Sequence, residues 1–71
     1  MVNTDKIKAR MREMHITQSQ LAEIMNLKQS TLSLKINRER PLFADEAEII
    51  RERLQIPDGE IRSYFFNTEI A

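Results

Sequence analysis

Cationic side chains gather in the first part of this 71-residue chain, and acidic side chains gather in the rest. Residues 1–40 hold eight Lys and Arg against four Asp and Glu, whereas residues 41–71 hold three against seven, so the two parts carry +4 and −4. Lys and Arg can neutralise phosphate groups. The first part is therefore suited to phosphate contacts, while the second faces away or meets another protein. The alternative interpretation is a solvated surface with unevenly placed charges.

Residue types that perform catalysis or bind metals are scarce. The chain has no Cys and a single His, His15, which excludes a disulfide framework and the usual Cys/His zinc clusters. No nucleophile paired with a base and no Gly-rich phosphate loop occurs, and a chain this short cannot wrap a sizeable pocket. Asp45, Glu46 and Glu48 are interpreted as acids at the start of a helix. We therefore expect no enzymatic activity, no cofactor, no metal and no small-molecule substrate.

The elements that position these charges are expected to be helices, because apolar residues recur at spacings of three and four. The predicted helices cover residues 5–14 after Thr4 as N-cap, 18–25, 29–36, 44–54, and a short stretch from 57 or 58 to about 66. The second is the best supported, since Thr17 and Gln20 form a capping box. Asn26 tolerates the left-handed backbone that a tight turn after this helix requires.

The core is expected to come from one stripe on each helix. These residues are Ile7, Met11, Met14, Leu21, Ala22, Met25, Leu32, Ile36, Ala47, Ile50 and Leu54. Tyr64, Phe65 and Phe66 are expected to close the last helix onto this core, the alternative being that one of them anchors a second subunit or another partner. His15 is interpreted as a residue at a helix end.

At this length we expect one domain with a modest stability of about 3 to 5 kcal/mol. No segment approaches the roughly 20 apolar residues of a membrane span, and the amino end lacks the pattern of a signal peptide. We therefore expect a cytoplasmic protein that does not bind membranes.

The segment from Ile16 to Pro41, ITQSQLAEIMNLKQSTLSLKINRERP, resembles the helix-turn-helix of the lambda-repressor and Cro-like family. The matching features are Thr17-Gln18, Leu21-Ala22, the turn Asn26-Leu27, the run from Ser30 to Ser33, and Arg40-Pro41. The tail IPDGEIRSYFF is similar to the ends of small Cro-like regulators from Gram-positive phages. This resemblance implies an all-α, compact five-helix, lambda-repressor-like domain over residues 1–71, with the helix-turn-helix at about 17–37.

The resemblance also implies roles for individual residues in a regulator of a phage-type lysis–lysogeny switch. Gln18 would hold a phosphate, and Gln29, Ser30 and Ser33 would meet the base edges of operator DNA. A glutamine amide can pair with adenine N7 and N6, and a serine hydroxyl can donate or accept. The expected phosphate contacts are Lys28, Lys35, Arg38 and Arg40, with Asn37 beside them. Two subunits would bind half-sites one helical turn apart.

Some residues depart from the family pattern and leave a second function open. Arg38 stands where relatives commonly have glycine, which predicts a loop of another shape. Leu34 is expected to be exposed in the middle of the reading face, where it would touch a thymine methyl or anchor another protein. The alternative function is therefore an antirepressor, or modulator, that uses the same surface to bind a cognate phage repressor. Zero net charge and the acidic second half support this alternative.

Overall fold

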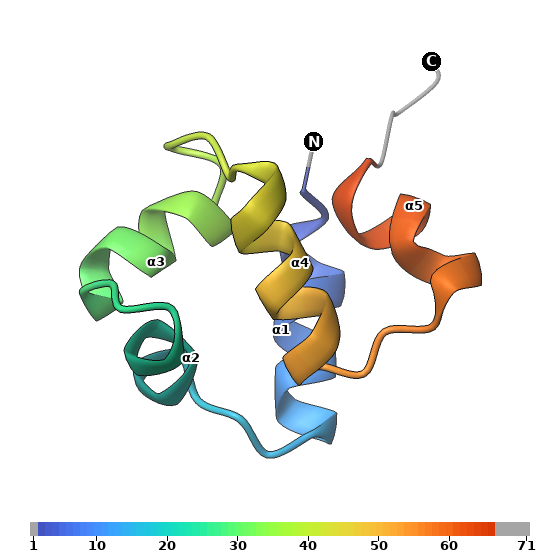
Figure 1. The fold of residues 1–71 in the computed structure, drawn as a ribbon, viewed down its shortest axis with the longest axis horizontal. Helices are drawn as coiled ribbons and strands as arrows, with labels where there is room; N and C mark the ends of the chain where they lie inside the picture. The colour runs from blue at the N-terminus through green and yellow to red at the C-terminus, as the bar shows by residue number, and fades with distance from the viewer. Residues whose placement is uncertain (1, 67–71) are drawn as a thin grey trace.

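The computed structural model describes residues 2–66, which form five α-helices and one short 3-10 helix and contain no strand (Figure 1). The elements are α1 (Thr4–Glu13), α2 (Gln18–Ile24), α3 (Gln29–Ile36), α4 (Ala44–Arg53), the 3-10 helix η1 (Asp58–Glu60) and α5 (Ile61–Phe65). The all-helical prediction is confirmed for these residues; the ends of the predicted domain, residues 1 and 67–71, lie outside them.

The buried core draws on all five α-helices and on Ile56 in the segment after α4. Its members are Ile7, Met11, Leu21, Ala22, Leu32, Ile36, Ile50, Leu54, Ile56, Tyr64 and Phe65. The predicted Met14, Met25 and Ala47 are partly buried and pack against it. Phe66 was expected in the core, and this prediction is wrong: its side chain is 62% exposed, because the chain leaves α5 at this residue.

The start of α2 follows the prediction, whereas the start of α1 does not. In the capping box of α2, Thr17 Oγ1 accepts from the Gln20 amide at 3.1 Å and Gln20 Oε1 accepts from the Thr17 amide at 2.9 Å. The N-cap of α1 is Asn3, whose Oδ1 accepts from the Lys6 amide at 3.2 Å. The predicted cap, Thr4, is the first residue of α1, and its hydroxyl donates to the Ile36 carbonyl at 2.6 Å. Thr4 therefore joins α1 to the end of α3.

Helices α1 to α4 all close in the same way, with a left-handed residue two positions after the last residue of the helix. The residues are His15 (φ 56°), Asn26 (φ 57°), Arg38 (φ 66°) and Gln55 (φ 51°). After each of them the next amide bonds to a carbonyl five residues earlier; Leu27 to Ala22 and Glu39 to Leu34, for instance, are both 2.8 Å. The prediction for Asn26 is confirmed. Arg38 was expected to give its loop another shape, but α3 closes as the other three helices do.

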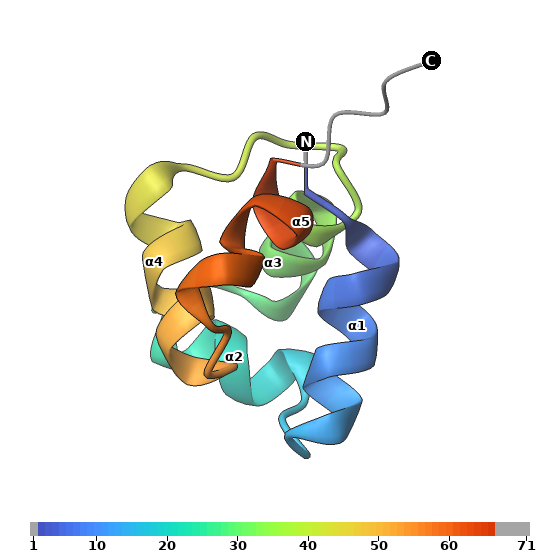
Figure 2. The ribbon, with the colours of Figure 1, turned by 90° about the vertical axis from the view of Figure 1, so that its right-hand side faces the viewer.

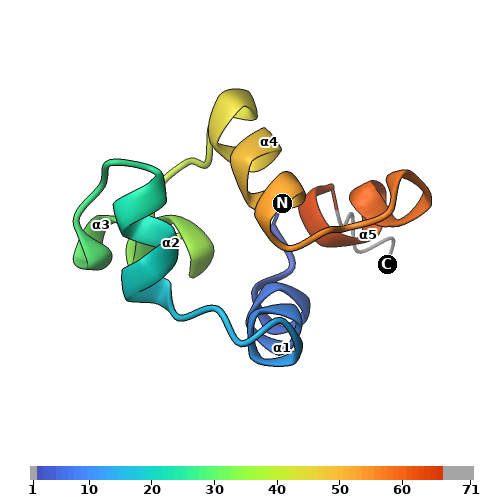
Figure 3. The ribbon, with the colours of Figure 1, turned by 60° about the horizontal axis from the view of Figure 1, so that its bottom comes forward.

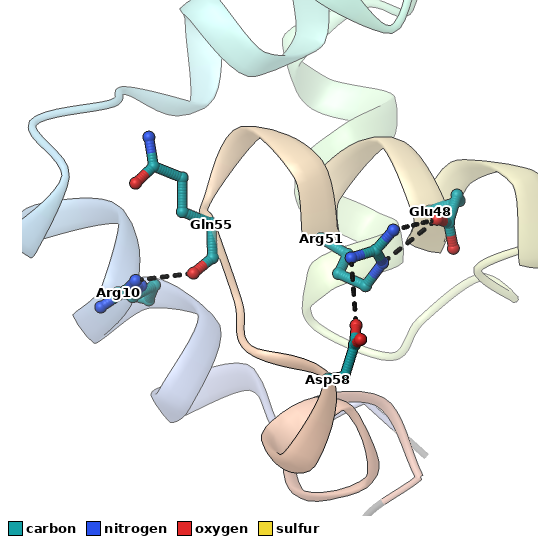
Figure 4. A network of polar contacts seen from close by, with 5 residues as sticks. All are labelled: Arg10, Glu48, Arg51, Gln55 and Asp58. Carbon is teal, nitrogen blue, oxygen red and sulfur yellow. Dashed lines mark hydrogen bonds and ion pairs between the residues drawn. The ribbon is translucent and has the colours of Figure 1, made fainter.

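Helix α1 is bonded to segments that lie far away in the sequence, and it runs beside α5 (Figure 2). The Asn3 amide donates to the Tyr64 carbonyl at 2.8 Å. Lys6 Nζ donates to Ser63 Oγ at 2.9 Å and lies 4.7 Å from the centre of the Tyr64 ring. Arg10 donates to the Leu54 and Gln55 carbonyls at 2.8 and 2.9 Å, which satisfies the end of α4. Figure 4 shows the bond to Gln55.

A second polar network ties α4 to η1 (Figure 4). Arg51 donates to Glu48 one turn earlier on α4, and Arg51 Nη1 lies 3.5 Å from Asp58 Oδ1. The hydrogen bond from Arg51 lowers the pKa of the Glu48 carboxyl below its ordinary value of 4.5, and the same bond raises the pKa of Arg51.

Among the helices of residues 2–66, none combines the length and apolar character needed to cross a membrane.

Candidate functional site

Helices α2 and α3 form one end of the molecule, away from α5 (Figures 1 and 3). They are joined by residues 25–28 and pack on each other. Their inner faces bury Leu21 and Ala22 from α2, and Leu32 and Ile36 from α3. Because α3 buries only this side, its other side is turned outward.

The outward side of α3 carries neutral hydrogen-bonding groups. Gln29 and Ser30 are exposed in the first turn, and Ser33 and Asn37 are half-buried further along. Asn37 Nδ2 donates to Ser33 Oγ at 3.2 Å, so the serine hydroxyl still has its own proton to donate outward. Leu34 was expected to be exposed, but it is half-buried. Its backbone carbonyl accepts from the Glu39 and Arg40 amides at 2.8 and 3.2 Å, which folds the following loop back against it.

Exposed cations stand at both ends of α3. Lys28 is the N-cap residue and makes no side-chain capping bond, while Arg38 and Arg40 follow the helix. None of these three side chains makes an ion pair or a hydrogen bond within residues 2–66. Their charges are therefore available to an anionic partner.

Lys35 was predicted to bind phosphate, and its position contradicts that role. The residue is 7% exposed, and its Nζ lies 2.8 Å from Glu46 Oε1 and 3.2 Å from the Pro41 carbonyl. The ring centre of Phe43 is 4.5 Å from the same nitrogen. Glu46 also accepts from the Phe43 amide at 2.9 Å, which fixes the start of α4. Lys35 thus joins α3 to α4 and has no free charge to offer a ligand.

Gln18, the first residue of α2, is half-buried and shares a surface depression with cations of α1. The depression is about 280 Å³ and is lined by Lys8, Met11, Arg12, Ile16 and Gln18. Lys8 and Arg12 were not among the predicted site residues. Their spacing of four placed them on one side of α1, but only the fold shows that this side adjoins the start of α2.

The surface formed by α2 and α3 is thus a neutral hydrogen-bonding helix face with a cation or a cation pair at each edge. Such a surface is suited to bind an extended anionic partner.

Within residues 2–66 no three His, Asp or Glu side chains are placed to hold a metal ion. Comparisons of the chain with protein-family models, with curated proteins and with solved structures each found no match.

Proposed function

We propose that this chain is a DNA-binding transcriptional regulator of a phage-type genetic switch. In this proposal α2, residues 25–28 and α3 act as a lambda-repressor-like helix-turn-helix, and α3 enters the major groove of an operator. The observation that carries the proposal is the outward face of α3, which is neutral and polar in its middle and cationic at both ends.

The dimensions of α3 fit this role. An α-helix with its side chains is about 10–12 Å across, which fits the width of about 12 Å of the major groove of B-DNA, and the eight residues of α3 extend about 12 Å along the helix axis. Lys28 at one end and Arg38 and Arg40 at the other would then meet the phosphates that border the groove. Gln29, Ser30 and Ser33 would face the base edges, where each good contact discriminates by about 1–3 kcal/mol.

Helix α1 and the start of α2 add a second cationic region to the proposed DNA-binding surface. Gln18 would bind a phosphate next to Lys8 and Arg12, which adds two cations to those around α3. We further propose that two copies bind two half-sites about one helical turn apart in the bacterial cytoplasm.

The test is fluorescence anisotropy of the purified chain against labelled DNA from its own genomic neighbourhood, with random DNA as competitor. We expect specific binding that weakens steeply with salt, because phosphate contacts release counterions. Gln29→Ala should reduce the preference for the specific site, whereas Gln55→Ala, at an exposed position after α4, should leave it unchanged. Equal binding to random and specific DNA would contradict the proposal.

A second candidate function is that of a modulator that binds a cognate phage repressor through the same surface. The observation that favours it is that Lys35 is buried and paired with Glu46, so its charge does not contribute to the surface. The exposed charges of residues 17–40 are then three cations, Lys28, Arg38 and Arg40, against two acids, Glu23 and Glu39. This small excess of positive charge and the half-buried, apolar Leu34 suit a protein partner.

The two candidates are separated by titrating the chain against helix-turn-helix repressors encoded in the same genomic region. For a modulator we expect tight binding to one of them, release of that repressor from its operator, and no specific DNA binding by the chain itself. Leu34→Lys should weaken the protein complex while the far-ultraviolet circular dichroism stays helical. A chain that binds DNA specifically and none of the repressors would contradict the modulator function.

A further inference from the structure

The amino-terminal segment, the loop between α3 and α4, and α5 come together at one end of the molecule (Figures 1 and 2). Residues of these three segments line an open groove. It measures about 330 Å³. Its lining combines the apolar side chains of Val2, Leu42 and Phe66 with the cationic side chains of Arg38 and Arg40. Pockets that hold small ligands begin at about 300 Å³, so the groove is large enough for one or two bulky side chains.

The apolar side chains that line the groove remain partly or largely exposed to solvent. Phe66 is 62% exposed, while Val2 and Leu42 beside it are half-buried. Phe65, the preceding residue, is buried and also lines the groove. The lining of the groove therefore includes one largely exposed aromatic ring, Phe66, that a ligand can cover. Aromatic residues and Arg are the types enriched in the centres of protein interfaces.

The two arginines that line the groove determine the charge of the ligand that it favours. Arg38 and Arg40 are exposed and make no ion pair within residues 2–66. Lys35, which also borders the groove, is already neutralised by Glu46. A ligand that fits must therefore place an apolar side chain against Phe66 and carboxylates against the two arginines, because a cationic ligand would be repelled.

We propose that the groove binds a peptide segment of another protein in which carboxylates flank a Leu or Phe side chain. The apolar side chain enters between Phe66 and Leu42, and the carboxylates bind the guanidinium groups of Arg38 and Arg40, which suit bidentate pairing. Because the proposed function assigns the same two arginines to DNA phosphates, a bound peptide competes with DNA for them. Peptide binding does not depend on the proposed function, whereas this competition does.

The first experiment measures peptide binding without DNA. The probe is a short fluorescein-labelled peptide of Asp, Glu, Leu and Phe, compared by anisotropy with one in which Lys replaces the acids and one in which Ser replaces Leu and Phe. We expect only the first to bind. Phe66→Ser should weaken binding about tenfold, a loss of about 1.4 kcal/mol. Ile24→Ser, which changes an apolar residue that is 41% exposed on α2, is the matched control and should have no effect.

Several outcomes would overturn the groove proposal. These are equal binding of the three peptides, equal effects of Phe66→Ser and Ile24→Ser, and sedimentation data showing a dimer that Phe66→Ser dissociates, since a second copy would then occupy the groove. Perturbation of the Val2 and Phe66 amide signals by random duplex DNA as strongly as by the peptide would assign the groove to nucleic acid instead.

The second experiment adds the acidic peptide to a complex of the chain with labelled DNA. We expect the apparent DNA affinity to fall as the peptide saturates the groove, and the Phe66→Ser variant to resist this effect at the same peptide concentration. Peptide binding that leaves DNA binding unchanged would contradict the proposed competition but would not affect the proposal that the groove binds the peptide. A chain that binds the peptide but no DNA would contradict the proposed function alone.

Discussion

Gln55 carries a left-handed backbone, with φ 51°, at the end of α4, and its side chain is exposed. A left-handed conformation costs a residue with a Cβ atom about 1–2 kcal/mol, whereas glycine adopts it freely. We expect Gln55→Gly to stabilise the protein by about 0.5–1 kcal/mol, part of the strain relief being offset by the greater freedom of glycine in the unfolded chain. For a domain of this size that raises the thermal midpoint by several degrees.

The matched control is Gln55→Ala, which removes the same side chain but keeps the Cβ atom, and so keeps the strain. Differential scanning calorimetry of both variants checks the prediction. If glycine and alanine shifted the midpoint equally, backbone strain would not be the cause.

Glu48 provides a test of an exposed ion pair. Its pKa is lowered by the hydrogen bond from Arg51, so its stabilising contribution is present above the ordinary pKa of 4.5 and is lost as the pH falls through the lowered value. We expect a carboxyl NMR titration to place the Glu48 pKa below 4.5, and Arg51→Met to return it. Because more than half of the Glu48 side chain is exposed, high salt should reduce the difference. A Glu48 pKa unaffected by Arg51→Met would rule out this pairing.

Single residues also show where sequence reasoning fails. Lys35 follows Leu34 and precedes Ile36, and at about 100° per residue it lies only about 60° around the helix from the buried Leu32. That position borders the core, but no local sequence pattern identifies Glu46, eleven residues later, as the partner. Its carboxylate offsets the cost of burying the Lys35 ammonium. Phe66 was misplaced for a related reason, since its exposure depends on where α5 ends against the rest of the fold.

At the scale of elements, the helices were predictable because their signals are local. The capping box of Thr17 and Gln20 fixed the start of α2, and the range predicted for α3 matches the observed one residue for residue. The start of α1 was off by one residue, because Asn3 and Thr4 are both good caps and the contact of Thr4 with Ile36 depends on tertiary structure.

The joint between α3 and α4 gives a prediction at this scale. Lys35→Met leaves the Glu46 carboxylate without its partner, and its side chain is only 15% exposed. Breaking a buried pair in this way costs about 3–5 kcal/mol, which approaches the whole stability expected for this domain. Replacing both residues, as Lys35→Met with Glu46→Leu, should restore most of the loss, since well-packed apolar pairs often substitute for buried ion pairs.

Urea unfolding of the two single variants and the double variant closes this cycle. The control is Arg10→Met with Glu13→Leu, a pair that is more exposed and separated by 3.7 Å, where the coupling should be small. Additive effects of Lys35→Met and Glu46→Leu would show that the two side chains do not stabilise each other.

At the scale of the whole molecule, the division of charge predicts which cations affect binding to an anionic partner. If Arg40 contacts a phosphate, Arg40→Gln should reduce the slope of log affinity against log salt by about 0.9. Arg53→Gln removes an equal charge from an exposed position on α4 and should leave the slope unchanged. Anisotropy over a range of salt concentrations measures both, and equal slopes for the two variants would mean that Arg40 makes no phosphate contact.

The bonds that α1 makes to the far end of the fold also govern how the chain matures on the ribosome. Asn3 bonds to Tyr64, so at about 5–20 residues per second their contact must wait roughly 3 to 12 s after Asn3 has been synthesised. Helical domains of this size fold in microseconds to milliseconds once complete. Translation therefore limits maturation, and until α5 has been synthesised α1 lacks the hydrogen bonds that Asn3 and Lys6 make with it.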